Sequence, residues 1–268
     1  MSLEYRNEEE AETEIADEQS EAVQRAISVV PYYSIIFIVC LIAVFLCQLT
    51  VDGQNSILFG GELSVLFAGF NKIFFKEGQY WRILTGATLH GGLIHLAFNG
   101  YALYVLGRLI ETLSNRAHLA IVFVLSAIGG GILSLIFLPD VPSIGASGGI
   151  VGFLGYLTVY GFKRRKLLPD GFLKNMLFNI ALMAFIGYYL RDKIDNFGHL
   201  GGLIVGAVYG FLQIPNDLYK DPREISPATK IFGLAACGIF ILTSIFTVLL
   251  LSGVVRIPFP NLLTTPFL

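Results

Sequence analysis

Charged side chains are scarce in this sequence. Asp, Glu, Lys and Arg make up 14% of the 268 residues, while hydrophobic residues make up 54%, and the mean hydropathy is +0.69. Soluble domains carry roughly a quarter of their residues as charged side chains. The shortage of charge therefore excludes an ordinary water-soluble globular protein and indicates a membrane protein.

Motifs for metal and cofactor binding are also missing. The three cysteines, Cys40, Cys47 and Cys237, lie within apolar stretches without the spacing of metal ligands, so we interpret them as small apolar residues. His90 and His95 have no glutamate between them, which excludes the zinc-protease motif HExxH. A phosphate-binding loop and a dinucleotide fingerprint are absent too. We therefore expect no metal ion and no other cofactor.

What the chain does contain is a series of long apolar segments between charged or proline-containing stretches. A helix crosses the bilayer core with roughly 20 residues, and most segments approach or exceed that length. The predicted fold class is an all-α polytopic membrane protein with seven transmembrane helices. The predicted spans are 31–51, 84–107, 118–138, 146–162, 175–190, 198–214 and 231–255.

The first 28 residues differ from the rest, because nine of the twenty acidic residues precede residue 22. We interpret residues 1–28 as a flexible, solvated cytoplasmic tail. A secretory signal or a transit peptide would need basic residues and few acids here, so neither is expected. Residues 29–214 would then form a core of six helices, and residues 215–268 a cytoplasmic loop, the seventh helix and a short outer tail.

The distribution of Lys and Arg predicts how the chain is oriented. If the tail is inside, twelve of the 18 basic residues lie on that side, as expected for cytoplasmic flanks. We therefore expect a cytoplasmic N-terminus and an outer C-terminus, in a prokaryotic plasma membrane since no targeting signal is recognised. The basic cluster at 163–166 could suit nucleic acid or anionic lipid, but an anchor between two spans is the commoner reason. Nucleic acid is therefore not an expected partner.

A few polar side chains lie inside the predicted spans, where such groups are costly and are therefore functional candidates. His95 and Asn99 share one helix face of the second span, with His90 more than a turn earlier, while Ser147 opens the fourth span and His199 the sixth. At about 1.5 Å per residue, His95, Ser147 and His199 lie roughly 20, 24 and 22 Å from the cytoplasmic ends of their spans. Those ends are taken near Arg108, Lys163 and Ile214. The three side chains are therefore expected at a similar depth in the membrane.

Glycine spacing predicts which spans touch. Gly198, Gly202, Gly206 and Gly210 recur every fourth residue on the sixth span, and a similar strip runs along the fourth. Such strips allow helices to approach closely. If the two strips face each other, the serine and the histidine at the start of these spans come within hydrogen-bonding reach.

Nucleophilic acyl transfer is the chemistry that fits this set of residues. His199 could take the proton of the Ser147 hydroxyl and later give it to the leaving amine. Neither Asp nor Glu lies inside a span where it could orient the imidazole, which predicts a dyad rather than a triad. The backbone N–H of Ser147, the Asn99 amide and His95 could stabilise the oxyanion.

Taken together, these residues resemble the rhomboid family of intramembrane serine proteases. The resemblance covers about residues 31–214 as a rhomboid-like six-helix core, and the seventh span resembles the C-terminal helix added in many members. The matching pieces are Trp81-Arg82, His90-Gly91 with His95 and Asn99, Gly145-Ala146-Ser147-Gly148, and His199 with Gly201-Gly202 and Gly206.

The resemblance implies roles for these positions. Ser147 would be the nucleophile, His199 the base and acid, and His95 and Asn99 the oxyanion-side residues. The Trp81-Arg82 pair would belong to a membrane-associated first loop, and the fifth span would gate lateral entry of the substrate. Substrates would be single-span membrane proteins in the lipid bilayer, cleaved near the outer face. Many relatives have an aromatic residue under the catalytic imidazole where this chain has Val151.

Other interpretations remain open. Each polar residue alone is more often a packing or hydrogen-bonding device between helices, and Trp81 and Arg82 are by default interfacial anchors. The chain could also be an inactive relative that binds membrane proteins for quality control, or a transporter, although the halves show no repeat and the spans hold no carboxylate. The GxSxG pattern at Gly145 requires a preceding strand in soluble hydrolases, and a proline-containing loop precedes it here.

Overall fold

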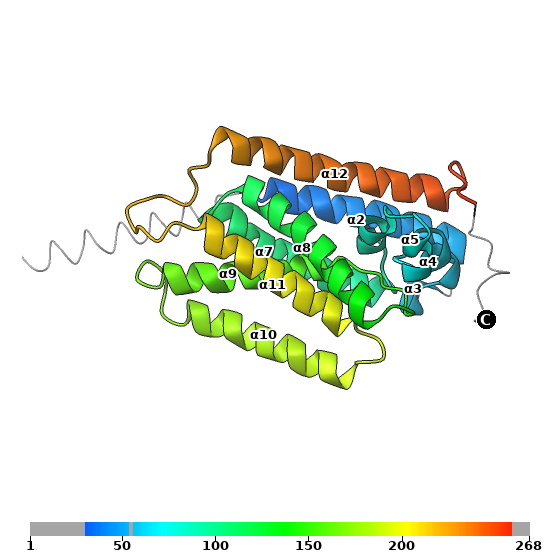
Figure 1. The fold of residues 1–268 in the computed structure, drawn as a ribbon, viewed down its shortest axis with the longest axis horizontal. Helices are drawn as coiled ribbons and strands as arrows, with labels where there is room; N and C mark the ends of the chain where they lie inside the picture. Colours follow the sequence, from blue (N-terminus) through cyan, green and yellow to red (C-terminus); the bar gives the residue numbers. More distant parts are fainter. Residues whose placement is uncertain (1–29, 54–55, 259–268) are drawn as a thin grey trace, which may run out of the picture.

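A computed structural model describes residues 30–53 and 56–258. Eleven α-helices and one short 3₁₀ turn make up the described part, whose one isolated β-bridge joins Phe70 to Ser143. Figure 1 shows the long helices packed side by side as one bundle. The predicted all-helical fold class is confirmed. The acidic tail predicted over 1–28 lies outside the described residues.

Seven long helices correspond to the seven predicted spans. Five of them are long and apolar enough to cross a membrane, namely α2, α7, α8, α10 and α12, and the chain is a multi-pass membrane protein. The other two, α9 and α11, have 17 and 18 residues, and both are rich in glycine and open on polar residues. The helices are α2 (Tyr32–Asp52), α7 (Leu93–Leu113), α8 (Arg116–Phe137), α9 (Ser147–Lys163), α10 (Phe172–Tyr189), α11 (Asn196–Gln213) and α12 (Pro227–Leu251).

The second span begins and ends later than predicted, although residues 93–107 do belong to it. Residues 84–92 do not belong to it, because they form the end of α6 (Arg82–Thr85), the 3₁₀ turn Gly86–Thr88 and a loop. Gly92, with a φ of 107°, turns the chain into α7, which continues past Arg108 to Leu113. The stretch 84–92 is apolar because other parts of the protein bury it, and not because it faces lipid.

The centre of the bundle is a close contact between α9 and α11. A Cβ atom added to Gly206 would lie 1.9 Å from the carbonyl oxygen of Gly152, and one added to Gly202 would lie 2.0 Å from that of Gly148. Any larger side chain at these positions would overlap the facing backbone. The predicted contact between the two glycine strips is therefore confirmed.

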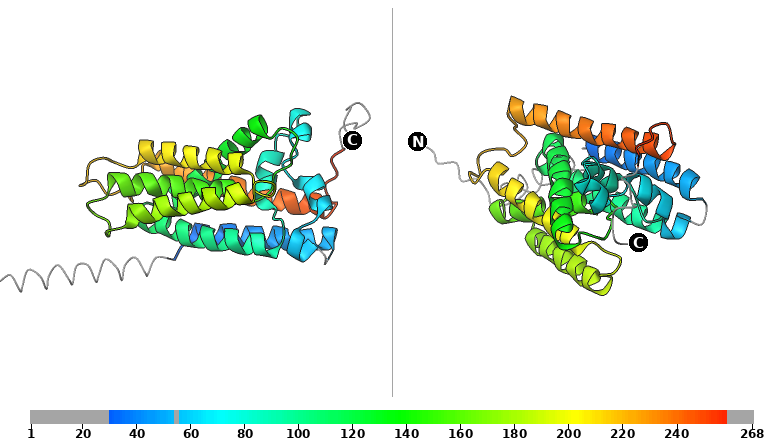
Figure 2. Two further views of the ribbon diagram at one scale, coloured as in Figure 1. Left: turned by 90° about the horizontal axis from the view of Figure 1, so that it is seen from below. Right: turned by 45° about the vertical axis from the view of Figure 1, so that its right-hand side comes forward.

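Other helices surround this pair. α8 approaches α11 through Gly201, where an added Cβ would lie 2.5 Å from the carbonyl oxygen of Gly129. α12 lies along α2 and α8 and packs Phe240 between Phe37 and Phe123, at ring-centroid distances of 4.4 and 4.9 Å. α10 lies at the opposite edge of the bundle (Figures 1 and 2). It buries only Met176 and Gly187, so α10 is the least embedded of the long helices described.

The segment between α2 and α7 folds into four short helices around a buried arginine. They are α3 (Ser56–Phe59), α4 (Glu62–Ala68), α5 (Lys72–Lys76) and α6. The guanidinium of Arg82 donates to the Gly69 carbonyl at 2.9 Å and to Gln79 Oε1 at 2.6 Å, and it stacks on Trp81 and Phe74. Burial lowers the pKa of Arg82 to about 10, so the side chain stays charged at neutral pH. Arg82 is therefore buried and holds this segment together. It does not lie at the membrane interface, as an arginine at this position would by default.

The α9–α11 contact makes a direct prediction about stability. Gly206→Ala places a methyl group against the Gly152 carbonyl, and we expect it to destabilise the fold by about 1–3 kcal/mol. Gly238→Ala is the matched control, because nothing lies within 4 Å of an added Cβ there and alanine favours a helix interior. Thermal unfolding in detergent should show a lower midpoint than wild type for Gly206→Ala. The midpoint of Gly238→Ala should not be lowered. Equal midpoints would contradict the packing described.

Candidate active site

Ser147 begins α9 after a loop with a glycine-specific conformation. Gly145 has a φ of 120° and donates its N–H to the Gly86 carbonyl at 2.9 Å. A Cβ on Gly145 would lie 2.9 Å from His95 Cε1 and 3.7 Å from Ser147 Oγ. Glycine is thus needed at this position both for its backbone angle and for space beside the His95 ring.

His199 lies in the first turn of α11 and meets Ser147. Its Nε2 is 2.8 Å from Ser147 Oγ, which is a hydrogen-bonding distance. The other ring nitrogen, Nδ1, is buried and has no hydrogen-bond partner in the described part of the chain. The arrangement is a serine–histidine pair, with no carboxylate bonded to the histidine among the described residues.

His95 lies next to this pair and Asn99 one turn further along α7. The Gly91 N–H donates to His95 Nδ1 at 3.2 Å, while Nε2 of the same ring would be 3.0 Å from a Cβ on Gly145. Asn99 is buried, and its Nδ2 has no hydrogen-bond partner among the described residues. His95 is 18 residues from the end of α7 at Leu113. The depth predicted for His95 by counting from Arg108 was therefore wrong, although its ring still lies beside Gly145.

Three other predicted residues, His90, Trp81 and Arg82, make their contacts away from the serine–histidine pair. His90 is fully buried, and its backbone N–H and carbonyl both bind the Gln48 side chain, at 2.9 and 3.1 Å. Burial lowers the pKa of His90 to about 3, with His95 acting in the same direction, so the ring is neutral. Trp81 packs edge-on against Phe246 of α12. His90, Trp81 and Arg82 therefore support the fold around the site.

Gly148 and Gly202, two further predicted residues, lie on the facing surfaces of α9 and α11. Gly148 follows the serine, and a Cβ on it would lie 3.6 Å from the Gly198 carbonyl. Gly202 contacts the Gly148 backbone, as described above. Val151 is buried one turn below Ser147. The two glycines set the separation of the helices, and hence the distance between the serine and the histidine.

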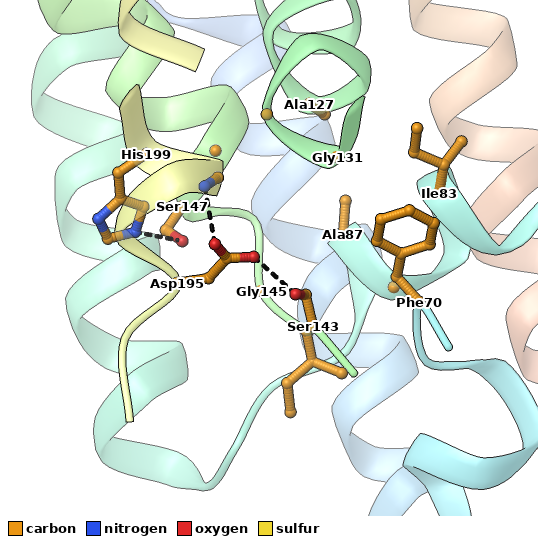
Figure 3. A pocket seen from close by; sticks show the side chains of 15 residues that line it. Phe70, Ile83, Ala87, Ala127, Gly131, Ser143, Gly145, Ser147, Asp195 and His199 are labelled. Atoms are coloured by element: carbon orange, nitrogen blue, oxygen red, sulfur yellow. Dashed lines mark hydrogen bonds between the residues drawn. The ribbon is translucent and has the colours of Figure 1, made fainter. Parts of the chain in front are cut away.

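A small cavity of about 50 Å³ opens beside Ser147 and His199. Small side chains dominate its wall, including Gly86, Ala87 and Ala127, and Phe70 and Ile83 close one side. Figure 3 shows the two catalytic candidates on one side of this cavity and Phe70 and Ile83 on the other. The space suits a group of only a few atoms.

Sequence reasoning missed two polar groups in this wall, Asp195 and Ser143. Asp195 caps the N-terminus of α11 by accepting the Gly198 N–H at 2.7 Å, and it also binds Ser143. The sixth span was predicted to start at 198, so this aspartate fell outside it. The signal was present, because Asp is a favoured residue immediately before a helix.

Comparison with known proteins identifies the family. The model of the Rhomboid domain matches residues 77–216. The rhomboid protease GluP of Bacillus subtilis (strain 168) is 33% identical over 77% of this chain and 38% of its own length. RHOMBOID-like protein 6, mitochondrial, of Arabidopsis thaliana is 36% identical over 56% of this chain and 50% of its own. The putative rhomboid protease YdcA of B. subtilis is 27% identical over 68% and 89%.

The chain belongs to the rhomboid family. It spans half or less of the length of the first two of these relatives, and both α2 and α12 lie outside the residues that the family model matches.

Proposed function

We propose that this protein is an intramembrane serine endopeptidase that hydrolyses peptide bonds in or near transmembrane segments of other proteins. The observation that carries the proposal is the 2.8 Å contact between Ser147 Oγ and His199 Nε2, in a chain with five candidate membrane spans. Family membership supports it, because GluP is named a rhomboid protease.

In the proposed reaction, Ser147 Oγ attacks the carbonyl carbon of the scissile peptide bond while neutral His199 accepts its proton at Nε2. The imidazolium then gives the proton to the leaving amine, and an acyl-enzyme remains. Water, activated by the same nitrogen, hydrolyses the ester and regenerates the serine. The absence of a partner on His199 Nδ1 among the described residues favours a dyad.

The oxyanion of the tetrahedral intermediate needs hydrogen-bond donors, and we propose three. The backbone N–H of Ser147 is in the first turn of α9, where helix N–H groups have no intrahelical acceptor. His95 Nδ1 accepts from the Gly91 N–H, so the proton of the neutral ring is on Nε2, the nitrogen that faces Gly145. Asn99 Nδ2 is a buried donor without a described partner, which an oxyanion would satisfy.

Substrate access is proposed to involve α10. This helix buries only two residues, and Asn196 Nδ2 binds its Gly187 carbonyl at 2.9 Å, near the start of α11. Displacing α10 would open the side of the bundle beside His199 to a single-span substrate in the bilayer. The small cavity beside Ser147 fits a small side chain at the cleaved bond.

The distribution of basic residues supports a proposed orientation of the chain in the membrane. Ser147 and His199 both lie in the first turns of their helices, at the end of the bundle opposite the basic cluster at 163–166. With a cytoplasmic N-terminus, cleavage would occur near the outer face of a prokaryotic plasma membrane.

The direct test is cleavage of a tagged single-span substrate by the purified full chain in liposomes. Ser147→Ala and His199→Ala should each lower the rate by about 10³-fold or more. Ser126→Ala is the matched control, since Ser126 is a buried serine facing Gly152 of α9 and should keep the wild-type rate. Binding of transmembrane helices without any cleavage across a panel of substrates would favour the inactive, quality-control relative.

A second prediction concerns Asn99. If its amide stabilises the oxyanion, Asn99→Ala should lower kcat by about 10²-fold and leave KM nearly unchanged, because the contact forms in the transition state. Asn179→Ala on the exposed face of α10 is the control, where the side chain binds only the Asn175 carbonyl. A rise in KM at constant kcat would instead assign Asn99 to substrate binding.

A further inference from the structure

Asp195 lies in the cavity wall beside the dyad, but the proposed reaction does not use it. Its Oδ1 accepts from the Gly198 N–H at 2.7 Å, and its Oδ2 accepts from Ser143 Oγ at 2.6 Å and from Ser134 Oγ. Figure 3 shows the carboxylate between the His199 turn and Ser143. One side chain therefore binds the start of α11, the loop before Ser147 and the end of α8.

A buried lysine completes this network from the other side. Lys72 of α5 is 1% exposed and donates to Ser143 Oγ at 2.6 Å and to the Val141 carbonyl. Because Ser143 receives a hydrogen bond from the ammonium, its own proton is directed to Asp195. Burial lowers the pKa of Lys72 to about 8, and the negative charge of Asp195 opposes that shift. The two charges are thus linked through one hydroxyl group.

The positions of these residues couple the two halves of the dyad. Ser143 is four residues before Ser147, and Asp195 is four residues before His199, whose N–H donates to the Asp195 carbonyl at 3.0 Å. The Ser143 backbone is itself fixed by paired hydrogen bonds with Phe70, at 3.0 and 3.1 Å. A shift of the Asp195–Ser143 contact would move the loop that carries the nucleophile relative to the helix that carries the base.

We propose that Asp195 is a positioning residue, which sets the distance between Ser147 Oγ and His199 Nε2 by binding Ser143 and the first turn of α11. Its carboxylate bonds neither dyad side chain in the described structure. The kinetic tests of this inference rest on the proposed protease function, whereas the NMR test described below does not. The competing explanation is that Asp195 does no more than cap α11.

Asp195→Asn separates the two explanations. Asparagine caps a helix about as well as aspartate, so α11 keeps its cap. The amide places an N–H₂ group or a weaker acceptor opposite Ser143, whose oxygen already receives Lys72. Since small displacements of reacting groups cost up to about 10²-fold, we expect kcat of the folded protein to fall about 10–100-fold, with KM within about twofold. Retained kcat in Asp195→Asn, with loss only in Asp195→Ala, would overturn the proposal.

Two further variants test the contact itself. Ser143→Ala should lower kcat by a similar factor, and the double variant with Asp195→Asn should lose no more than either single change, because both remove one interaction. Additive losses would contradict the coupling. Ser226→Ala is the control, since it removes the cap of α12, remote from the cavity, and should leave kcat unchanged.

Nitrogen NMR of histidine-labelled protein provides a readout that needs no cleavage. The chain has four histidines, so His199→Ala identifies the His199 Nε2 signal and Ser147→Ala gives its position without the hydrogen bond. We expect the signal in Asp195→Asn to move toward that position, and a wild-type signal would contradict the positioning role. If the signal moves as expected but the wild-type protein cleaves no substrate, the proposed function fails while the positioning role stands.

Discussion

The contact of backbone against backbone between α9 and α11 is the constraint on which the site depends. Ser147 and His199 are 52 residues apart in sequence, and each lies in the first turn of its helix. They reach 2.8 Å only because Gly148, Gly152 and their partners on α11 carry no side chain. The five helices that are long and apolar enough to cross a membrane, α2, α7, α8, α10 and α12, are the other long helices of the bundle.

A second requirement is an ordered outer segment between α2 and α7. Its backbone is held by side chains that are themselves buried, Arg82 within the segment and Gln48 on α2. This segment contains Gly86, whose carbonyl accepts the Gly145 N–H, and Gly91, whose N–H donates to the His95 ring. The dyad therefore depends on polar contacts outside the long helices as well as on helix packing. Asp195 and Lys72 extend the same principle to the other side of the cavity.

Much of the fold was predictable, because spans and glycine strips leave periodic local signals. Seven apolar segments correspond to seven helices. The spacing of the glycines was enough to predict that Ser147 and His199 lie close together. The start of α7 was not predictable, since residues 84–92 are as apolar as a span but are buried by the protein itself. The burial of Arg82 was not predictable for a similar reason, because nothing local distinguishes an arginine at the interface from one inside a loop. The links from Asp195 to Ser134, Ser143 and Lys72 join distant segments, which no single-sequence pattern reveals.

In the proposed mechanism, His199 activates Ser147 without a carboxylate bonded to its imidazole. The most direct measurement is to treat the folded protein with a fluorophosphonate and map the modified residue by mass spectrometry of its peptides. A serine–histidine dyad predicts one adduct, on Ser147, formed at a rate that falls sharply in His199→Ala. An adduct on another serine, or equal modification of Ser147 in the histidine variant, would contradict it.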